Sequence, residues 1–243
     1  MPATTTRPRT PAPPQPAQQP GGGKHQRTSE FVLSAFEKAV LPRLAAALPK
    51  WVKPDHLTIL GLLASTGIAV AYMLTNHDPR WLWAVSALLV VQWFGDSLDG
   101  TLARVRRAER PRYGYYLDHL TDAYSTLAIG LGLGFSPYML LSVGLAIVVA
   151  YLILSVNVYL ETHVFAEFSF SYGRLGPTEV RVLLILLNTA VFFGAAMPFD
   201  LLGSGATVFD VFGIAAALAM LGLLLARAAG NLRRLAKLEP PRA

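Results

Sequence analysis

Six stretches of mostly apolar residues, each long enough to cross a bilayer as a helix, dominate this sequence of 243 residues. A helix needs about 20 apolar residues to cross a hydrocarbon core about 30 Å thick. The predicted spans are residues 57–75, 81–103, 115–135, 137–160, 179–197 and 208–227. Charged residues make up only 15% of the chain, against roughly 25% in soluble domains. We therefore predict an all-α integral membrane protein with six transmembrane helices.

The segments around these spans differ from them in composition. Residues 1–29 hold seven of the 17 prolines, and we predict a disordered cytosolic tail there. Residues 30–52 are predicted to form an amphipathic juxtamembrane helix along the membrane surface. Its apolar residues at helical spacing are Phe31, Val32, Ala35, Phe36, Ala39 and Val40. The six-helix domain would then occupy residues 53–230, followed by a basic cytosolic tail over 231–243.

The basic residues assign an orientation to this arrangement. With the N-terminus in the cytosol, 20 of the 21 Lys and Arg residues fall on the cytosolic side, and only Arg80 falls outside. Loops rich in Lys and Arg stay in the cytosol. We therefore expect both termini in the cytosol, in a membrane of the bacterial plasma-membrane type. The net charge of +6 is explained by topology and anionic lipid, so no nucleic-acid partner is predicted. The chain has no cysteine, which excludes thiolate chemistry.

Four of the eight aspartates lie within one short stretch of the sequence. Asp96 and Asp99 come near the cytosolic end of the second span, and Asp118 and Asp122 near the cytosolic start of the third. Spacings of three and four residues put each pair on one helix face. Carboxylates are costly inside a membrane and repel one another, whereas divalent cations prefer oxygen ligands and would neutralise them. The pattern predicts a site for two divalent ions able to act in phosphoryl transfer.

Small residues and an arginine accompany these aspartates. Gly100 follows Asp99 directly, and Gly114 precedes Asp118 by about one turn, so both leave room for a ligand near the backbone. Arg104 lies one turn beyond Gly100 and offers hydrogen-bond donors suited to phosphate. Carboxylates, small residues and a cation are therefore expected to share one cavity.

These residues resemble the signature of the CDP-alcohol phosphotransferase family, which is two Asp three apart, Gly, two residues, Ala-Arg, a spacer of about eight, and Gly-x3-Asp-x3-Asp. The matching sequence is Asp96-Ser-Leu-Asp99-Gly100-Thr-Leu-Ala103-Arg104, then nine residues, then Gly114-x3-Asp118-x3-Asp122. The spacer here is one residue longer than in the signature. The resemblance covers about residues 30–230 and implies an enzyme of phospholipid biosynthesis, a homodimer in the family's usual form. Such an enzyme transfers a substituted phosphate from a CDP-linked donor to a hydroxyl and releases CMP.

The resemblance also implies roles for single residues. Asp96, Asp99 and Asp118 would ligate two Mg²⁺ or Mn²⁺ ions, while Asp122 would complete this set and act as general base. The residues expected to bind the CDP moiety are Asp55, Thr58, Gly100, Arg104 and Gly114. Asp55 belongs to a segment similar to the family's Pro-Asn-x-Ile/Leu-Thr element, where it replaces the usual Asn.

A second, shorter resemblance lies before the fifth span. The sequence Gly176-Pro177-Thr178-Glu179 is similar to an element of the choline- and ethanolamine-phosphotransferase branch. Candidate residues for the headgroup or acceptor are Arg174, Glu179 and Arg181. Thr178 and Glu179 are equally what a helix N-terminus prefers.

Several alternatives stay open at this level. A membrane prenyltransferase also pairs Asp-rich helices with magnesium and pyrophosphate, but lacks the Asp-Gly and Ala-Arg context. An ion transporter would place its acidic residues near mid-membrane or on both sides, rather than clustered on one side. The lipid could be the donor, as CDP-diacylglycerol, or the acceptor, as a diacylglycerol-like alcohol.

Overall fold

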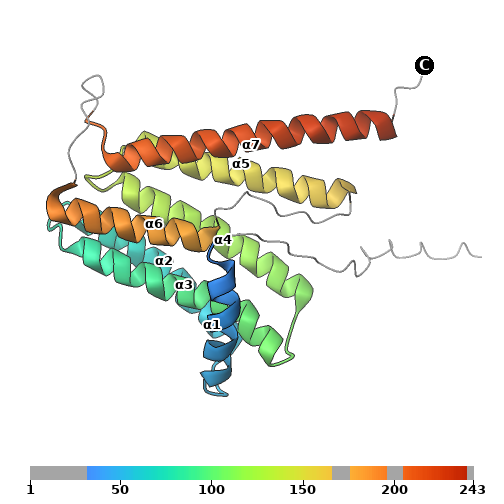
Figure 1. The fold of residues 1–243 in the computed structure, drawn as a ribbon, viewed down its shortest axis with the longest axis horizontal. Coiled ribbons are helices and arrows are strands. Elements are labelled where there is room, and N and C mark those ends of the chain that lie inside the picture. Colours follow the sequence, from blue (N-terminus) through green and yellow to red (C-terminus); the bar gives the residue numbers. More distant parts are fainter. Residues whose placement is uncertain (1–31, 166–175, 196–204, 240–243) are drawn as a thin grey trace, which may run out of the picture.

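The computed structural model describes residues 32–165, 176–195 and 205–239, and these are helical with short connections and no strand (Figure 1). The helices are α1 (Ser34–Ala47), α2 (Pro54–Leu74), α3 (Trp81–Val105), α4 (Pro111–Gly134), α5 (Leu141–Phe165), α6 (Pro177–Ala190) with a π-helical turn η1 (Val191–Ala195), and α7 (Val208–Leu238). The prediction of an all-α fold is confirmed.

The helix ends differ from the predicted spans for local reasons. Proline begins α2, α4 and α6 at Pro54, Pro111 and Pro177. Its missing N–H costs nothing at the first helical position, so each helix starts earlier than its apolar run. At the other end of the chain, α7 continues to Leu238, well beyond the apolar residues, because its last turns are rich in Ala, Leu, Arg and Lys, which favour helix.

Five helical segments in the described part of the chain are long and apolar enough to cross a membrane. They are α2, α3, α5, residues 177–194 and α7. The helix α4 is not among them, since it carries Arg112, Asp118 and Asp122. It nevertheless packs between α2 and α5. From α2 to α7, consecutive helices alternate in direction (Figure 1). The structure thus establishes a multi-pass membrane architecture, and the crossing of the membrane by α4 stays a prediction.

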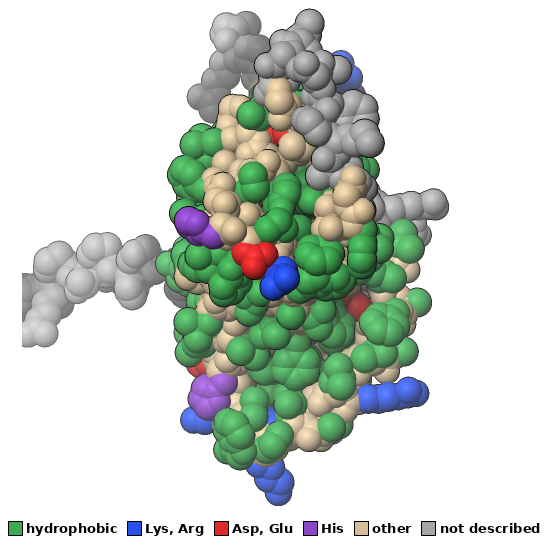
Figure 2. Space-filling model, turned by 90° about the vertical axis from the view of Figure 1, so that its left-hand side faces the viewer, with side chains coloured by type: hydrophobic (Ala, Val, Ile, Leu, Met, Phe, Trp, Pro, Cys, Tyr) green, Lys and Arg blue, Asp and Glu red, His purple; other side chains and the backbone are tan. Residues whose placement is uncertain are grey.

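The ends of the bundle differ in charge. The starts of α2, α4 and α6 gather at one end with the last turns of α3, α5 and α7 (Figure 1), and we call this the basic end. From the last turn of α3 to the first turn of α4 it holds Arg104, Arg106, Arg107, Arg110 and Arg112. The opposite end shows mainly apolar side chains with few charged ones (Figure 2).

The helix α1 lies crosswise to the bundle at the basic end (Figure 1). Its buried residues Leu41 and Ala45 join a small core with Leu98 and Leu102 of α3. Its Glu37 accepts hydrogen bonds from the Trp93 indole of α3 (3.0 Å) and, at 2.5 Å, from the Thr178 hydroxyl of α6. These contacts fix α1 against two helices of the bundle, while Val32 and Phe36 remain exposed.

Close contact between α2 and α3 depends on glycine. A Cβ atom added at Gly95 would lie 2.6 Å from the Leu57 carbonyl oxygen and 2.7 Å from the Gly61 nitrogen. Only a residue without a side chain allows this separation. The approach brings the start of α2 beside the turn of α3 that carries Asp96 and Asp99.

Candidate active site

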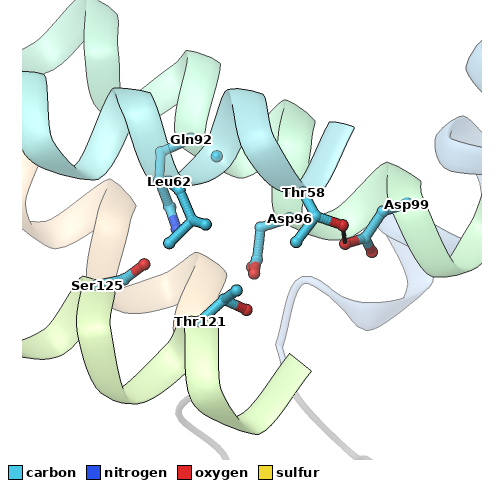
Figure 3. Close-up of a pocket in the computed structure, with 8 residues that line it drawn as sticks. Thr58, Leu62, Gln92, Asp96, Asp99, Thr121 and Ser125 are labelled. Carbon is cyan, nitrogen blue, oxygen red and sulfur yellow. Dashed lines mark hydrogen bonds between the residues drawn. The ribbon is translucent and has the colours of Figure 1, made fainter. Parts of the chain in front are cut away.

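A small cleft opens where α2, α3 and α4 meet near the basic end (Figure 3). Residues from all three helices line it: Thr58, Gly61, Leu62, Gln92, Asp96, Asp99, Thr121 and Ser125. Its cavity volume is about 10 Å³, space for about one water molecule, whereas small-molecule sites typically measure roughly 300–1,000 Å³. In this structure the cleft is therefore too small for a nucleotide-linked donor.

Asp99 is held in place from two sides. The Thr58 hydroxyl of α2 donates a hydrogen bond of 2.7 Å to Asp99 Oδ2 (Figure 3). The Gly100 N–H donates to the other carboxylate oxygen, Oδ1. Thr58 is buried, and its position one turn into α2 follows from the helix starting at Pro54. The predicted contact of Thr58 with the CDP moiety stays a prediction, and in the structure its hydroxyl orients a carboxylate.

Asp96 faces the interior of the bundle and pairs with an arginine from α6. Its Oδ2 lies 2.5 Å from Arg181 Nη2, and the Arg181 Nε–H donates to the amide oxygen of Gln92. Arg181 is only 9% exposed and Gln92 3%, so the pair is largely shielded from water. Burial strengthens the attraction between them and makes either charge costly if left alone. Arg181 therefore compensates one negative charge of the cleft.

Asp118 and Asp122 come from α4 on the facing side of the cleft. Both are partly buried. Coulombic repulsion acts between Asp122 and each of Asp96, Asp118 and Asp99, so the four aspartates are within electrostatic reach of one another. The structure thus brings all four predicted residues to one region of the bundle.

The donor chemistry of this region fits hard divalent cations, because four carboxylates outnumber the one buried arginine paired with them. Among the described residues, however, no three acidic or histidine side chains are arranged to hold one metal ion. In this structure Asp96 pairs with Arg181, and Asp99 accepts hydrogen bonds from Thr58 and from the Gly100 N–H.

The predicted phosphate-binding residues lie beside Asp99. The exposed side chain of Arg104 folds back over α3, where Nη2 donates 2.9 Å to the Thr101 hydroxyl. A Cβ at Gly100 would lie 3.4 Å from Arg104 Nη1, so the glycine lets the guanidinium approach the helix. A Cβ at Gly114 would meet nothing within 4 Å, which leaves open space on that side.

Asp55 at the start of α2 forms an ion pair with Arg110 from the connection between α3 and α4. The guanidinium of Arg110 also lies 3.8 Å from the centre of the Tyr113 ring. The hydrogen bond to Asp55 raises the pKa of the Arg110 guanidinium, which stays protonated. Sequence analysis counted Arg110 only among the basic residues that set the topology and did not foresee this pairing.

The three candidates for the headgroup or acceptor differ in their positions. Arg174 lies outside the described residues. Glu179 accepts hydrogen bonds from the backbone N–H groups of Leu33 (2.7 Å) and Gly176 (3.0 Å), so it caps α6 and holds the start of α1. This is the helix-terminus role that the sequence also allowed. Arg181 is the headgroup candidate that reaches the cleft.

Comparison with known proteins connects this geometry to a family. The family model described as CDP-alcohol phosphatidyltransferase matches residues 51–226, a range that contains every residue lining the cleft. The chain belongs to the CDP-alcohol phosphatidyltransferase family.

The curated relatives of this family member carry more than one name. Cholinephosphotransferase 1 of Rattus norvegicus is 28% identical over 165 residues, covering 63% of this chain and 40% of the relative. Cholinephosphotransferase 1 of Gallus gallus is 29% identical over 225 residues, covering 84% and 64%. A CDP-diacylglycerol–glycerol-3-phosphate 3-phosphatidyltransferase of Cereibacter sphaeroides is 35% identical over 99 residues, covering 39% and 44%. The chain thus spans less than two thirds of the length of each of these relatives.

Sequence analysis missed three polar residues that line the cleft, Gln92, Thr121 and Ser125. Gln92 lies one helical turn before Asp96 and holds Arg181, and Ser125 lies one turn beyond Thr121 and hydrogen-bonds Ser65 of α2 at 2.9 Å. A signal for all three was present, because each continues the helix face of an aspartate at a spacing of three or four residues.

Proposed function

We propose that this chain transfers a substituted phosphate group from a CDP-linked donor to an acceptor hydroxyl and releases CMP. The observation that carries the proposal is the cleft between α2, α3 and α4, where Asp96 and Asp99 are oriented by Arg181 and Thr58 inside the matched region. Such a prepositioned set of charges suits a reaction whose catalysis consists mainly of positioning and charge stabilisation.

Asp96, Asp99, Asp118 and Asp122 would hold two divalent ions, Mg²⁺ or Mn²⁺. When bound, the ions would supply charge neutralisation for the donor's diphosphate. Thr58 and the Gly100 N–H fix Asp99 before any ligand arrives, so that part of the site needs no ordering during the reaction.

The proposed reaction transfers one proton and exchanges one bond at phosphorus for another. Asp122 accepts the proton of the acceptor hydroxyl as general base. The acceptor oxygen forms a bond to the phosphorus distal to the cytidine, and the bond from that phosphorus to the bridging oxygen breaks. The electron pair leaves with CMP. Arg104 is placed to bind donor phosphate, and Gly100 and Gly114 leave space for the nucleotide portion.

Arg181 would serve the headgroup or acceptor side of the reaction, with Arg174, which precedes α6 in the sequence, and Glu179, in the first turn of α6, as the other candidates. We favour a small CDP-linked alcohol as donor and a diacylglycerol-like lipid as acceptor. Two features support this choice: the cholinephosphotransferase names of several relatives and the sequence Gly176-Pro177-Thr178-Glu179. The Cereibacter sphaeroides relative supports the second candidate, CDP-diacylglycerol with a polar alcohol.

The basic end, with the cleft, would face the cytosol. The 20-to-1 division of Lys and Arg supports this orientation. The same proposal includes three further expectations: the chain forms a homodimer, α1 lies along the membrane surface, and residues 1–29 are a cytosolic tail.

The test is a matrix of CDP-linked donors and acceptor alcohols, with the purified full chain in lipid nanodiscs. The donors include CDP-choline, CDP-ethanolamine and CDP-diacylglycerol, and the acceptors diacylglycerol and glycerol 3-phosphate. CMP release and the lipid product are measured with Mg²⁺, with Mn²⁺ and with a chelator. We expect metal-dependent CMP release with at least one pair, and absence of CMP release from every pair would reject the proposal.

A further inference from the structure

Arg110 connects the two helices that face each other across the cleft. Its guanidinium pairs with Asp55 in the first turn of α2 and stacks on Tyr113 in the first turn of α4. One turn beyond Asp55, Thr58 holds Asp99. The ion pair therefore lies at the basic end of the helix that shapes the carboxylate site, with its two side chains 53% and 39% exposed.

The backbone around Asp55 is held independently of Arg110. Arg106, at the end of α3, donates to the carbonyl oxygens of the segment between α1 and α2. These carbonyls belong to Leu48, Pro49, Lys50 and Val52. With this segment fixed and Pro54 starting the helix, Asp55 keeps its place whether or not Arg110 pairs with it.

A carboxylate at Asp55 is electrostatically unfavourable for binding of an anionic donor unless its charge is compensated. An anionic diphosphate donor that approaches from the basic end meets the four aspartates of α3 and α4 and a fifth carboxylate, Asp55. Like charges at distances of several ångströms repel by about 1 kcal/mol in a water-like medium, and by more where water is partly excluded. The ion pair with Arg110 removes this repulsion, since the pair carries no net charge.

We propose that Arg110 is a positioning residue for the anionic donor: it neutralises and orients Asp55, so that a carboxylate can stand where the donor binds. This inference rests on the proposed function. It assigns to Arg110 an effect on donor binding that acts through Asp55, not through direct contact with the ligand. The exposed ion pair contributes little to stability, so the effect on binding is separable from folding.

The experiment measures equilibrium binding of CDP, in the presence of Mg²⁺, to the full chain in nanodiscs. The variants are Arg110→Ala, Asp55→Asn and the double variant Asp55→Asn/Arg110→Ala. Arg112→Ala is the matched control, because it removes another exposed arginine from the same region. Melting temperatures check that every variant folds, and KM and kcat for the active donor are compared with the binding data.

We expect Arg110→Ala to weaken CDP binding about tenfold and to raise KM equally, with kcat little changed. The double variant should return to within about twofold of the wild type, since the uncompensated carboxylate is then gone. Arg112→Ala should bind CDP like the wild type. Equal weakening in Arg110→Ala and the double variant would overturn the inference, as would wild-type binding by Arg110→Ala. If the wild-type chain itself binds no CDP and releases no CMP, the proposed function fails instead.

Discussion

The guanidinium of Arg181 lies 2.5 Å from the carboxylate of Asp96, and both side chains are mostly buried. The arginine comes from α6 and the aspartate from α3. The pair therefore joins two helices through residues that are 85 positions apart in the sequence. The charge of Arg181 offsets only part of the four carboxylates of α3 and α4. The pair therefore links α3 to α6, and in the proposed function the other carboxylates remain for the divalent cations.

Replacing this arginine should destabilise the protein. Arg181→Gln leaves Asp96 as a mostly buried, uncompensated carboxylate, which typically costs roughly 3 kcal/mol. We expect a lower melting temperature in nanodiscs, and partial recovery on adding Mg²⁺, because a ligand that binds only the folded state stabilises it.

The double variant Arg181→Gln/Asp96→Asn provides the control. It removes both charges and should recover most of the lost stability, since neither charge is then left without its partner. A single Arg181→Gln variant as stable as the wild type would show that the ion pair does not stabilise the bundle.

The proposed general base gives a prediction about rate. Asp122→Asn cannot accept a proton, and general-base catalysis contributes roughly 10²- to 10⁴-fold. CMP release should fall by at least about 100-fold, while the melting temperature stays near that of the wild type. Asp78→Asn at the opposite end of the bundle is the matched substitution and should keep its activity. Normal CMP release by Asp122→Asn would contradict the role given to Asp122.

Sequence alone predicted the helical fold and the region of the site, because both depend on local patterns. Apolar runs predicted the helices, and the spacing of Asp96, Asp99, Asp118 and Asp122 placed each pair on one face of its helix, α3 or α4, both of which pack against α2. The family match over residues 51–226 agrees with the resemblance drawn from those residues.

Other features needed the tertiary structure. The partners of Asp96 and Asp55 are Arg181 and Arg110, which lie far away in sequence and could not be chosen among 21 basic residues. Helix ends shifted where proline or strong helix formers extended a helix past its apolar run. The crossing of the membrane by α4 stays a prediction, since its charged residues lower its apolar character although it packs against α2 and α5.

Thr58 provides a test of how far the orientation of Asp99 matters. Thr58→Val keeps the shape but removes the hydroxyl that donates to Asp99 Oδ2. A hydrogen bond to a charged group contributes about 1.5–3 kcal/mol, so kcat/KM should fall roughly 10- to 100-fold. Thr58→Ser should retain most of the activity. Thr66→Val, which removes a hydroxyl bonded to Tyr124 on the exposed side of α2, should have little effect. Equal activity in Thr58→Val and the wild type would refute a role for this hydrogen bond.

Gly95 tests whether the contact between α2 and α3 sets the geometry of the site. In Gly95→Ala the new methyl group would lie 2.6 Å from the Leu57 carbonyl oxygen, so the two helices must separate. Overpacking of this kind costs typically 1–3 kcal/mol and would move Thr58 away from Asp99. We therefore expect a lower melting temperature together with reduced CMP release. Gly222→Ala on α7 is the matched control, since its Cβ would meet nothing within 4 Å. If both alanine variants behave alike, close approach at Gly95 is not what positions the two aspartates of α3.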